Sequence, residues 1–329
     1  MTPSELQNHS SLLSWSGATS FYIKRDDLIN EGFACSKVRV ARRLIDDAIK
    51  IKCDSIFCTA LSGSSMVSTL SRMTKEHGMK MFAFVKMQNY SNSAHKKVQY
   101  SLENGCNFII SESNESLRHD SLNVAKAINR IKGKGYKPYQ TQFSGSGPIA
   151  IEAYIQAGLE LAKQLRENSI ESNNCLIYVP AATGTLAFGV GLGLMLSGSK
   201  AKLVCCGLCK VGYAELRSLI GHLESIRSQL SLPVDWLRKL LARNEFRNIW
   251  EDSPFSIPDS SICVKLRRYE NNISSKFDEV YTSKAFMRVI LDGERELIKN
   301  RDVVFWMTGS EIDSGEYPVL DATNALLVN

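Results

Sequence analysis

The sequence predicts an α/β fold with mostly parallel β-sheets. Two observations predict it: short runs rich in β-branched and aromatic residues alternate with amphipathic runs of helical spacing, and this order continues through most of the chain. Strands that alternate with helices imply parallel pairing, with helices on both faces of the sheet. The 329 residues, 44% of them hydrophobic, suffice for one large or two medium domains.

The first half of the chain follows this alternation regularly. Gly78 and Gly105 mark the ends of two amphipathic runs. We predict strands over residues 21–27, 55–60, 80–86 and 106–110, and helices over residues 37–51, 64–77, 93–102 and 116–131.

The second half begins with a long helix over residues 149–166, with Pro148 at its first turn. Ligands of parallel α/β folds bind beyond the carboxyl ends of strands, so the loops that follow strands are the candidate functional loops. We predict strands over residues 175–180, 202–208, 261–266 and 303–306, and helices over residues 185–196, 214–230, 235–243 and 283–299.

Charge and cysteine content argue against a nucleic-acid-binding or metal-binding protein. The net charge is +6, and the basic residues are scattered or stand beside acidic residues on predicted helices. The nine cysteines are an odd number and are spread along the chain, which favours free thiols in a reducing compartment. Cys205, Cys206 and Cys209 lie in an apolar, strand-like run, so we interpret them as buried thiols and predict no metal site.

We expect a cytoplasmic protein without a membrane segment. The N-terminus lacks the charged and then apolar regions of a secretory signal. Residues 176–196 carry no charge and are long enough to span a bilayer, but Pro180 and the sequence Thr183-Gly184-Thr185 interrupt them. We interpret this stretch as a buried strand, a tight loop and a buried helix.

The loop from Pro180 to Thr185 has the composition of an anion site. It joins an apolar strand to an apolar helix, where unpaired backbone N–H groups and the helix dipole attract negative charge. Gly184 allows a phosphate to approach the backbone, and Thr183 and Thr185 add two hydroxyls. A tight strand-to-helix turn needs similar residues, so the loop alone leaves both interpretations open.

Residues 20–44, SFYIKRDDLINEGFACSKVRVARRL, resemble the family of D-cysteine desulfhydrase and 1-aminocyclopropane-1-carboxylate deaminase. These are pyridoxal-phosphate enzymes of fold type II, the tryptophan-synthase-β-like fold. KRDDL stands intact at residues 24–28, and the family's "GGNKvR" corresponds to ACSKVR at residues 34–39. The resemblance implies that Lys37 carries pyridoxal 5'-phosphate. Without these flanking matches, Lys37 would be interpreted as a surface lysine at a helix start.

Further motifs follow in the family's order and extend the resemblance over residues 20–310. CTALSGSSM (58–66) corresponds to "GGxQSNH", FDEVYTSKAF (277–286) to "LDPVYTGKAm", VVFWMTGS (303–310) to "VlFlHTGG", and residues 175–189 to the phosphate loop. The resemblance implies the catalytic residues Lys37, Tyr281 and Ser64. It implies cofactor contacts by Lys37, Ser65, Thr183, Gly184, Thr185, Thr282 and Thr308.

The implied roles suit the residue types. Lys37 can act as general base on the substrate's Cα, and the phenol of Tyr281 can move a proton, although packing at a strand-helix junction is the alternative for Tyr281. Thr282 would sit near the pyridine nitrogen, where ring-opening deaminases have glutamate. A neutral residue there gives a weaker electron sink, which suits β-elimination.

Several motifs depart from the family pattern. Ser65 stands for asparagine and Met66 for histidine, while ACSK replaces "GGNK" and MTGS replaces "HTGG". The resemblance therefore implies that the cofactor-binding framework is retained and that the substrate pocket differs.

We expect two three-layer α/β domains with mostly parallel, twisted sheets: a larger one from residues 1–49 and 144–329, and a smaller inserted one over residues 50–143. The expected activity is that of a lyase or deaminase that converts a small amino acid into an α-keto acid and ammonia. A β-replacement enzyme and a catalytically degenerate family member are the alternatives. The expected assembly is a homodimer.

Overall fold

The computed structural model describes residues 3–29, 35–87, 92–111, 117, 120–208, 213–227, 229–230, 232–248 and 260–310. Within these ranges the chain divides into two compact units. The first unit holds residues 3–29 and 147–310, and the second holds residues 35–146.

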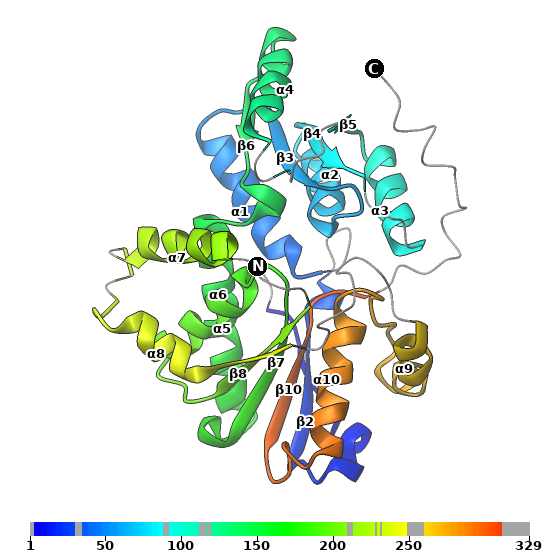
Figure 1. Ribbon diagram of the computed structural model, residues 1–329, viewed down its shortest axis with the longest axis vertical. Helices are drawn as coiled ribbons and strands as arrows, with labels where there is room; N and C mark the ends of the chain where they lie inside the picture. The colour runs from blue at the N-terminus through cyan, green and yellow to red at the C-terminus, as the bar shows by residue number, and fades with distance from the viewer. Residues whose placement is uncertain are drawn as a thin grey trace. The chain divides into compact units, whose positions relative to one another are not determined.

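The first unit is built on a six-stranded sheet in the order β1-β2-β10-β7-β8-β9 (Figure 1). All neighbouring strands are parallel except β1, which runs antiparallel to β2. Because β10 lies between β2 and β7, strands from both ends of the chain meet at the centre of the sheet. The strands are β1 (Leu6–Asn8), β2 (Ser20–Arg25), β7 (Cys175–Ala181), β8 (Lys202–Gly207), β9 (Asn244–Asn248) and β10 (Asp302–Met307).

Two hydrophobic clusters belong to this unit. One joins the sheet to α9 and α10, and the other joins α5, α6, α7 and α8. The α-helices are α5 (Pro148–Glu167), α6 (Thr185–Leu196), α7 (Tyr213–Arg227), α8 (Trp236–Arg243), α9 (Ser260–Ile273) and α10 (Thr282–Glu294), and the 3-10 helices are η1 (Ser10–Ser16), η2 (Asp26–Leu28) and η4 (Ser172–Asn174).

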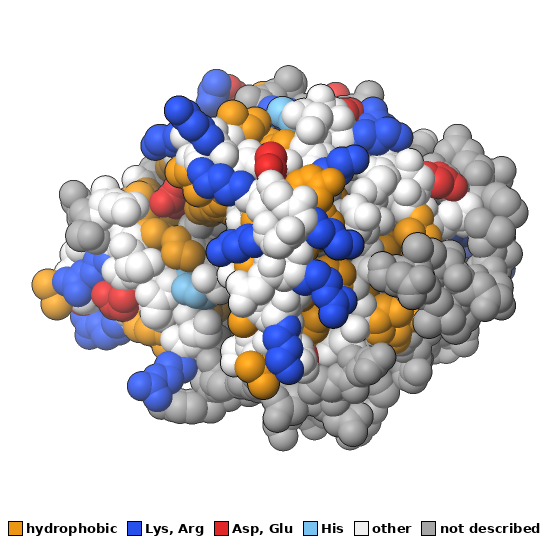
Figure 2. Space-filling view, turned by 90° about the horizontal axis from the view of Figure 1, so that it is seen from above, with side chains coloured by type: hydrophobic (Ala, Val, Ile, Leu, Met, Phe, Trp, Pro, Cys, Tyr) orange, Lys and Arg blue, Asp and Glu red, His pale blue; other side chains and the backbone are white. Residues whose placement is uncertain are grey.

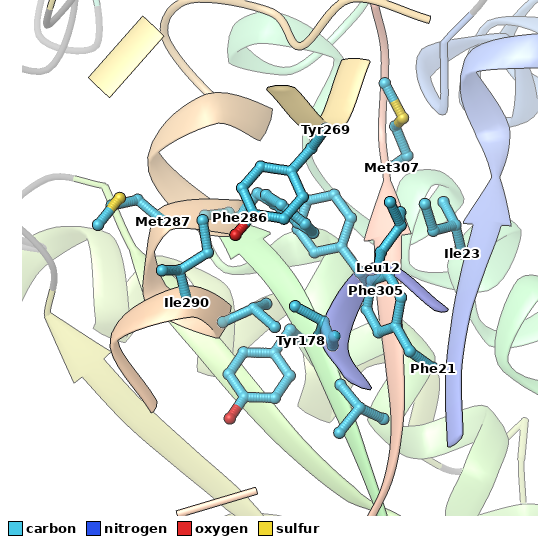
Figure 3. Packing of buried hydrophobic residues seen from close by; sticks show 14 of the residues in the cluster. Leu12, Phe21, Ile23, Tyr178, Tyr269, Phe286, Met287, Ile290, Phe305 and Met307 are labelled. Atoms are coloured by element: carbon cyan, nitrogen blue, oxygen red, sulfur yellow. The ribbon is translucent and has the colours of Figure 1, made fainter. Parts of the chain in front are cut away.

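Aromatic rings tie the start of α10 to the sheet. Phe286 stacks on Phe277, with 4.7 Å between ring centroids, and meets the edge of Phe305 at 5.1 Å. Tyr269 of α9 approaches Phe286 at 5.3 Å, and Figure 3 shows the rings of Tyr269, Phe286 and Phe305 close to one another. Such contacts are worth about 0.5–1.5 kcal/mol each beyond the burial of apolar area. The packing therefore fixes the segment over residues 277–282, which carries two of the predicted site residues.

The second unit is a four-stranded, fully parallel sheet in the order β5-β4-β3-β6. The helix α4 packs on Phe57, Phe82 and Phe84 of this sheet, while α2 contacts β3, β4, α1 and α3. The elements are α1 (Lys37–Lys50), β3 (Ser55–Leu61), α2 (Ser65–Glu76), β4 (Lys80–Lys86), α3 (Asn92–Glu103), β5 (Cys106–Ile110), α4 (Ser121–Gly133), β6 (Pro138–Gln140) and the 3-10 helix η3 (Phe143–Gly145).

The predicted α/β class and parallel sheets are confirmed, and one predicted strand is wrong. Residues 261–266 begin the helix α9. Buried Ile262, Leu266, Tyr269 and Ile273 recur at helical spacing and pack in the cluster with α10. A short run rich in β-branched residues suits either element, and here tertiary packing selects the helix. The short strands β1, β6 and β9 were not predicted, and α10 ends at Glu294, earlier than predicted.

The unit boundary also differs from the predicted one. Residues 35–49 and 144–146, predicted for the larger domain, belong to the second unit. The reason is that α1 packs on α2 and β3. An amphipathic pattern predicts that α1 buries one face, but it does not specify which sheet receives that face.

The uncharged stretch over residues 176–196 is divided between β7 and α6, as predicted. Val190, Gly191 and Leu192 of α6 are all buried, which explains why this helix is apolar all round. Among the described helices, none combines the length and apolarity that a bilayer span requires. On the face drawn in Figure 2, lysine and arginine side chains are interspersed with uncharged and hydrophobic ones.

Candidate functional site

The loop between β7 and α6 has the backbone that an anion site needs. Gly184 is the N-cap of α6 and adopts a left-handed conformation, with φ 80° and ψ −13°. The first helical bond runs from Phe188 N–H to Gly184 O, so the preceding N–H groups of the first turn have no acceptor within the helix. The hydroxyls of Thr183 and Thr185 lie 3.1 Å apart beside these groups. The loop therefore presents N–H and hydroxyl donors together at the positive end of a helix.

Thr308 leaves the same edge of the sheet as this loop. The strands β10 and β7 are parallel neighbours, with Phe305 opposite Tyr178. Thr308 directly follows β10 and is partly exposed. A bridge between Phe277 and Ser310 brings the segment before α10 to this edge. The structure thus gathers the loop at Thr183–Thr185, Thr308 and the start of α10 at the carboxyl ends of two adjacent strands.

Asp278, which the sequence analysis did not name, organises the start of α10. Its Oδ1 atom accepts the backbone N–H of Val280 at 3.0 Å and that of Tyr281 at 2.7 Å. Its backbone N–H donates to Oγ1 of Thr282 at 2.6 Å, and its carbonyl accepts the N–H of Ser283. An aspartate just before a helix start is the sequence signal that would have identified this role.

Tyr281 and Thr282 differ in accessibility. Tyr281 is the N-cap of α10 and is partly exposed, whereas Thr282 is fully buried. The Thr282 hydroxyl accepts the N–H of Asp278 and lies 3.4 Å from the carbonyl oxygen of Asp278. The hydroxyl thus accepts from the backbone N–H of Asp278 and donates its own proton to the carbonyl of Asp278, which makes it part of the hydrogen-bonded turn around Asp278.

Lys37 is the first residue of α1 in the second unit and is partly exposed. Its neighbour Cys35 places Sγ 3.5 Å from the Thr69 hydroxyl on α2, and that hydroxyl donates to the carbonyl of Ser65 at 2.7 Å. The starts of α1 and α2 are therefore linked. Burial raises the pKa of the Cys58 thiol on β3 to about 11. The positive charge of Lys37 acts in the opposite direction and lowers that pKa.

Ser64 and Ser65 begin α2. Ser64 is the N-cap, and its hydroxyl accepts the N–H of Met66 at 3.2 Å and lies 3.3 Å from the hydroxyl of Ser144. Ser65 is the first helical residue and is partly exposed. Met66, at the position of the family's histidine, is fully buried against Gly145, where a Cβ atom would lie 2.5 Å from Met66 Cε. Met66 is thus a packing residue, and the two serines carry the polar groups of this turn.

Lys24, the lysine of KRDDL, is occupied by structural contacts. It is fully buried, forms an ion pair with Glu160, and donates to Gln164 Oε1 and the carbonyl of Ser4 at 2.6 Å each. Lys37, by contrast, forms no side-chain hydrogen bond or ion pair with the described residues. Of the two lysines in the motif region, Lys37 is the one available for covalent chemistry.

The predicted site residues thus form two groups. Thr183, Gly184, Thr185, Tyr281, Thr282 and Thr308 belong to the first unit, and Lys37, Ser64 and Ser65 belong to the second.

The described cysteines are free thiols, and those within strands are buried. Cys205 and Cys206 lie in β8, and burial raises the pKa of Cys205 to about 12. Cys209 lies outside the described residues. In the described part of the chain, no three His, Cys, Asp or Glu side chains are grouped as metal ligands.

The comparisons with known proteins cover most of the chain, including both units. Nocardicin C-9' epimerase of Nocardia uniformis subsp. tsuyamanensis is 24% identical over 301 residues, which cover 89% of this chain and 87% of that protein. D-cysteine desulfhydrase of Serratia proteamaculans is 22% identical over 286 residues, covering 83% and 80% of the two chains. No protein-family model matches the chain.

A crystal structure of an ACC deaminase homologue superposes on 99% of this chain and 94% of its own, with a TM-score of 0.79 and 21% sequence identity. The chain is similar to D-cysteine desulfhydrase along most of its length and has the fold of type II pyridoxal-phosphate enzymes.

Proposed function

We propose that this chain is a pyridoxal-phosphate-dependent lyase that removes a β-substituent or ammonia from a small amino acid and releases an α-keto acid and ammonia. The observation that carries the proposal is the contrast between the two lysines of the motif region. Lys24 is buried and paired with Glu160, whereas Lys37 is accessible at a helix start that aligns with the family's cofactor-bearing lysine.

The residues present fit pyridoxal phosphate. Its phosphate needs several N–H and hydroxyl donors around a backbone without a side chain, and the Thr183–Thr185 loop supplies them. Its aldehyde carbon needs an amine without an ion-pair partner, and within the described residues Lys37 has no such partner. When bound, pyridoxal phosphate supplies an electron sink for the negative charge that develops at the substrate's Cα.

In the proposed mechanism the chain's own residues bind, orient and move protons. The Thr183–Thr185 loop would hold the phosphate, and Ser65, Thr282 and Thr308 would orient the ring. Lys37 would take the proton from the substrate's Cα, and Ser64 would donate a hydrogen bond to the substrate. The phenol of Tyr281 would transfer a proton to the leaving β-substituent, and one water would then replace the amino group, which gives the α-keto acid and ammonia.

A spectral and product screen tests this function. Purified protein loaded with pyridoxal phosphate is expected to absorb in the visible range and to respond to a small D- or L-amino acid with release of an α-keto acid and ammonia. Absence of visible absorbance after loading would favour the degenerate alternative and reject the proposal. Consumption of an added thiol or amine without keto-acid release would assign β-replacement instead.

Epimerisation is a second candidate, supported by the similarity to nocardicin C-9' epimerase over most of both chains. It needs proton removal and return at a carbon centre, but no leaving group. Chiral chromatography of each amino acid after incubation separates the two activities, because an epimerase yields the opposite enantiomer without keto acid.

A further inference from the structure

The motif KRDDL contains a buried ion pair, Arg25–Asp27, that has no role in the proposed mechanism. Arg25 and Asp27 are both buried, with 3% and 1% of their surfaces exposed. The Arg25 guanidinium donates from Nε and Nη2 to the two carboxylate oxygens of Asp27, at 2.8 Å each. A buried ion pair is stable only where its remaining hydrogen-bonding groups also have partners, so the residues that these two contact reveal what the pair holds.

Both members of the pair hold the end of α9. Nη1 of Arg25 donates to the carbonyl of Ile273, the last residue of α9, at 3.1 Å. Oδ2 of Asp27 accepts the hydroxyl of Ser275 at 2.9 Å. A guanidinium at a helix C-terminus satisfies an orphan carbonyl and complements the negative end of the helix dipole. The pair thus fixes residues 273–275 against the end of β2.

From this anchor a short chain of contacts leads to Tyr281. Phe277 N–H donates to Oε1 of Glu270 at 3.0 Å, and the Phe277 ring stacks on Phe286. The next residue, Asp278, accepts the N–H of Tyr281 and holds the hydroxyl of Thr282. Only two residues separate Ser275 from Asp278, so a shift at the anchor reaches the start of α10 directly.

The other two charged residues of the motif, Lys24 and Asp26, contact different parts of the first unit. Lys24 contacts Glu160 and Gln164 of α5, and Oδ1 of Asp26 accepts the hydroxyl of Ser4 at 2.7 Å. These contacts anchor the N-terminal segment to α5 and do not involve residues 273–282. The motif therefore contains two buried carboxylates, Asp26 and Asp27, each of which accepts a serine hydroxyl. Among the described contacts, the chain that leads to Tyr281 starts from Asp27.

We propose that Arg25 and Asp27 are positioning residues that hold the 273–278 segment, and through it Tyr281 and Thr282, in register for proton transfer. The assignment of Tyr281 to proton transfer rests on the proposed function. The geometric part of the inference, that the pair orders the start of α10, stands independently of that function and is tested separately.

The test compares two matched hydroxyl deletions in the full-length protein. Ser275→Ala removes the hydroxyl that contacts Asp27, and Ser4→Ala removes the hydroxyl that contacts Asp26. Hydrogen–deuterium exchange of the peptide over residues 277–286 reports the order of the Val280 and Tyr281 amides without any need for turnover. Steady-state kinetics of the cofactor-loaded enzyme report kcat and KM, and Ser275→Thr restores a hydroxyl.

We expect Ser275→Ala to speed exchange in that peptide and to lower kcat about three- to tenfold with KM nearly unchanged, because one hydrogen bond of the anchor is lost. Ser4→Ala is expected to leave the exchange rate and kcat unchanged. Ser275→Thr is expected to restore the wild-type exchange rate and kcat. Equal effects of the two alanine variants, or no change in exchange for Ser275→Ala, would overturn the positioning role. If the wild-type protein shows no turnover, the proposed function fails while the exchange result still decides the geometry.

A second set of two matched variants tests the carboxylates of Asp27 and Asp26. Asp27→Asn and Asp26→Asn each remove one buried charge from the same motif. A similar loss of thermal stability in both, with faster exchange at residues 277–286 only in Asp27→Asn, supports positioning. Faster exchange in both variants would reduce the pair to a general stabilising role and reject the proposal.

Discussion

Oδ1 of Asp278 accepts the backbone N–H of Tyr281 at 2.7 Å, at the point where α10 begins. The same oxygen accepts the N–H of Val280, so one carboxylate satisfies two amides before the helix starts. The structure thereby couples a buried acidic side chain to the backbone of the residue that we assign to proton transfer.

Asp278→Ala is expected to destabilise the protein by about 0.5–2 kcal/mol, the usual effect of losing a helix cap, and to lower kcat. Thermal unfolding and steady-state kinetics measure the two effects. Asp278→Asn keeps an acceptor oxygen at the same place and serves as the control, which should retain most of the activity. Equal losses in both variants would mean that the charge of Asp278, and not its hydrogen bonds, is what α10 requires.

Lys37→Ala is expected to abolish the visible absorbance of the loaded protein and all turnover, because the amine that carries the cofactor is gone. Lys50→Ala, at the exposed far end of the same helix α1, is the control and should behave as wild type. Borohydride reduction followed by mass spectrometry identifies the modified lysine. A cofactor still attached covalently in Lys37→Ala would place the anchor at another lysine.

Gly184→Val is expected to weaken cofactor binding strongly, because a branched side chain at φ 80° is strained and covers the backbone donors of the loop. Its Cβ would also lie 3.0 Å from Leu219. Gly198→Val is the matched control, since Gly198 has φ 75° near the other end of α6 and an added Cβ meets no atom within 4 Å. Equilibrium titration with pyridoxal phosphate measures the cofactor affinity of the two variants. Unchanged affinity in Gly184→Val would move the phosphate site, residues 144–147 being the next candidate.

Tyr281→Phe removes only the phenol oxygen, so the fold and the visible spectrum should persist while kcat falls. A loss of roughly a hundredfold or more fits general acid–base catalysis. Tyr269→Phe provides the control, because Tyr269 lies in the aromatic core beside Phe286 and has no role in the proposed chemistry. A wild-type rate for Tyr281→Phe would make Tyr281 a packing residue and leave Lys37 as the sole proton-transfer group.

The cysteines should differ sharply in reactivity. Burial raises the pKa of Cys58 to about 11 and that of Cys106 to about 12, so both remain protonated at pH 8 as well as inaccessible. Cys53 and Cys263 are partly exposed. Among the eight described cysteines, iodoacetamide labelling at pH 8 with peptide mass spectrometry should therefore modify Cys53 and Cys263 first. Fast labelling of Cys58 in the native protein would contradict the buried position of β3.

The elements that the sequence predicted well are those whose signal is local. The strands β4 and β5 and the helix α6 occupy the predicted residues, because the apolar run of each segment and the glycines beside it are encoded locally. Residues 261–266 were assigned wrongly because a six-residue apolar run fits a strand or a helix, and only its packing against α10 distinguishes them. The short edge strand β9 follows α8 without a break, and its pairing with β8 is a long-range contact.

The sequence by itself determined the fold class and the identity of the candidate residues, because motif order and periodicity are properties of the chain alone. It could not reveal that Lys24 is a structural residue, that Asp278 holds the turn before α10, or that Arg25 and Asp27 contact Ile273 and Ser275. Those partners lie 248 residues apart along the chain. Only the tertiary structure brings them together, because β2 and α9 must both bury their apolar faces in the same core before a guanidinium and a distant carbonyl can meet.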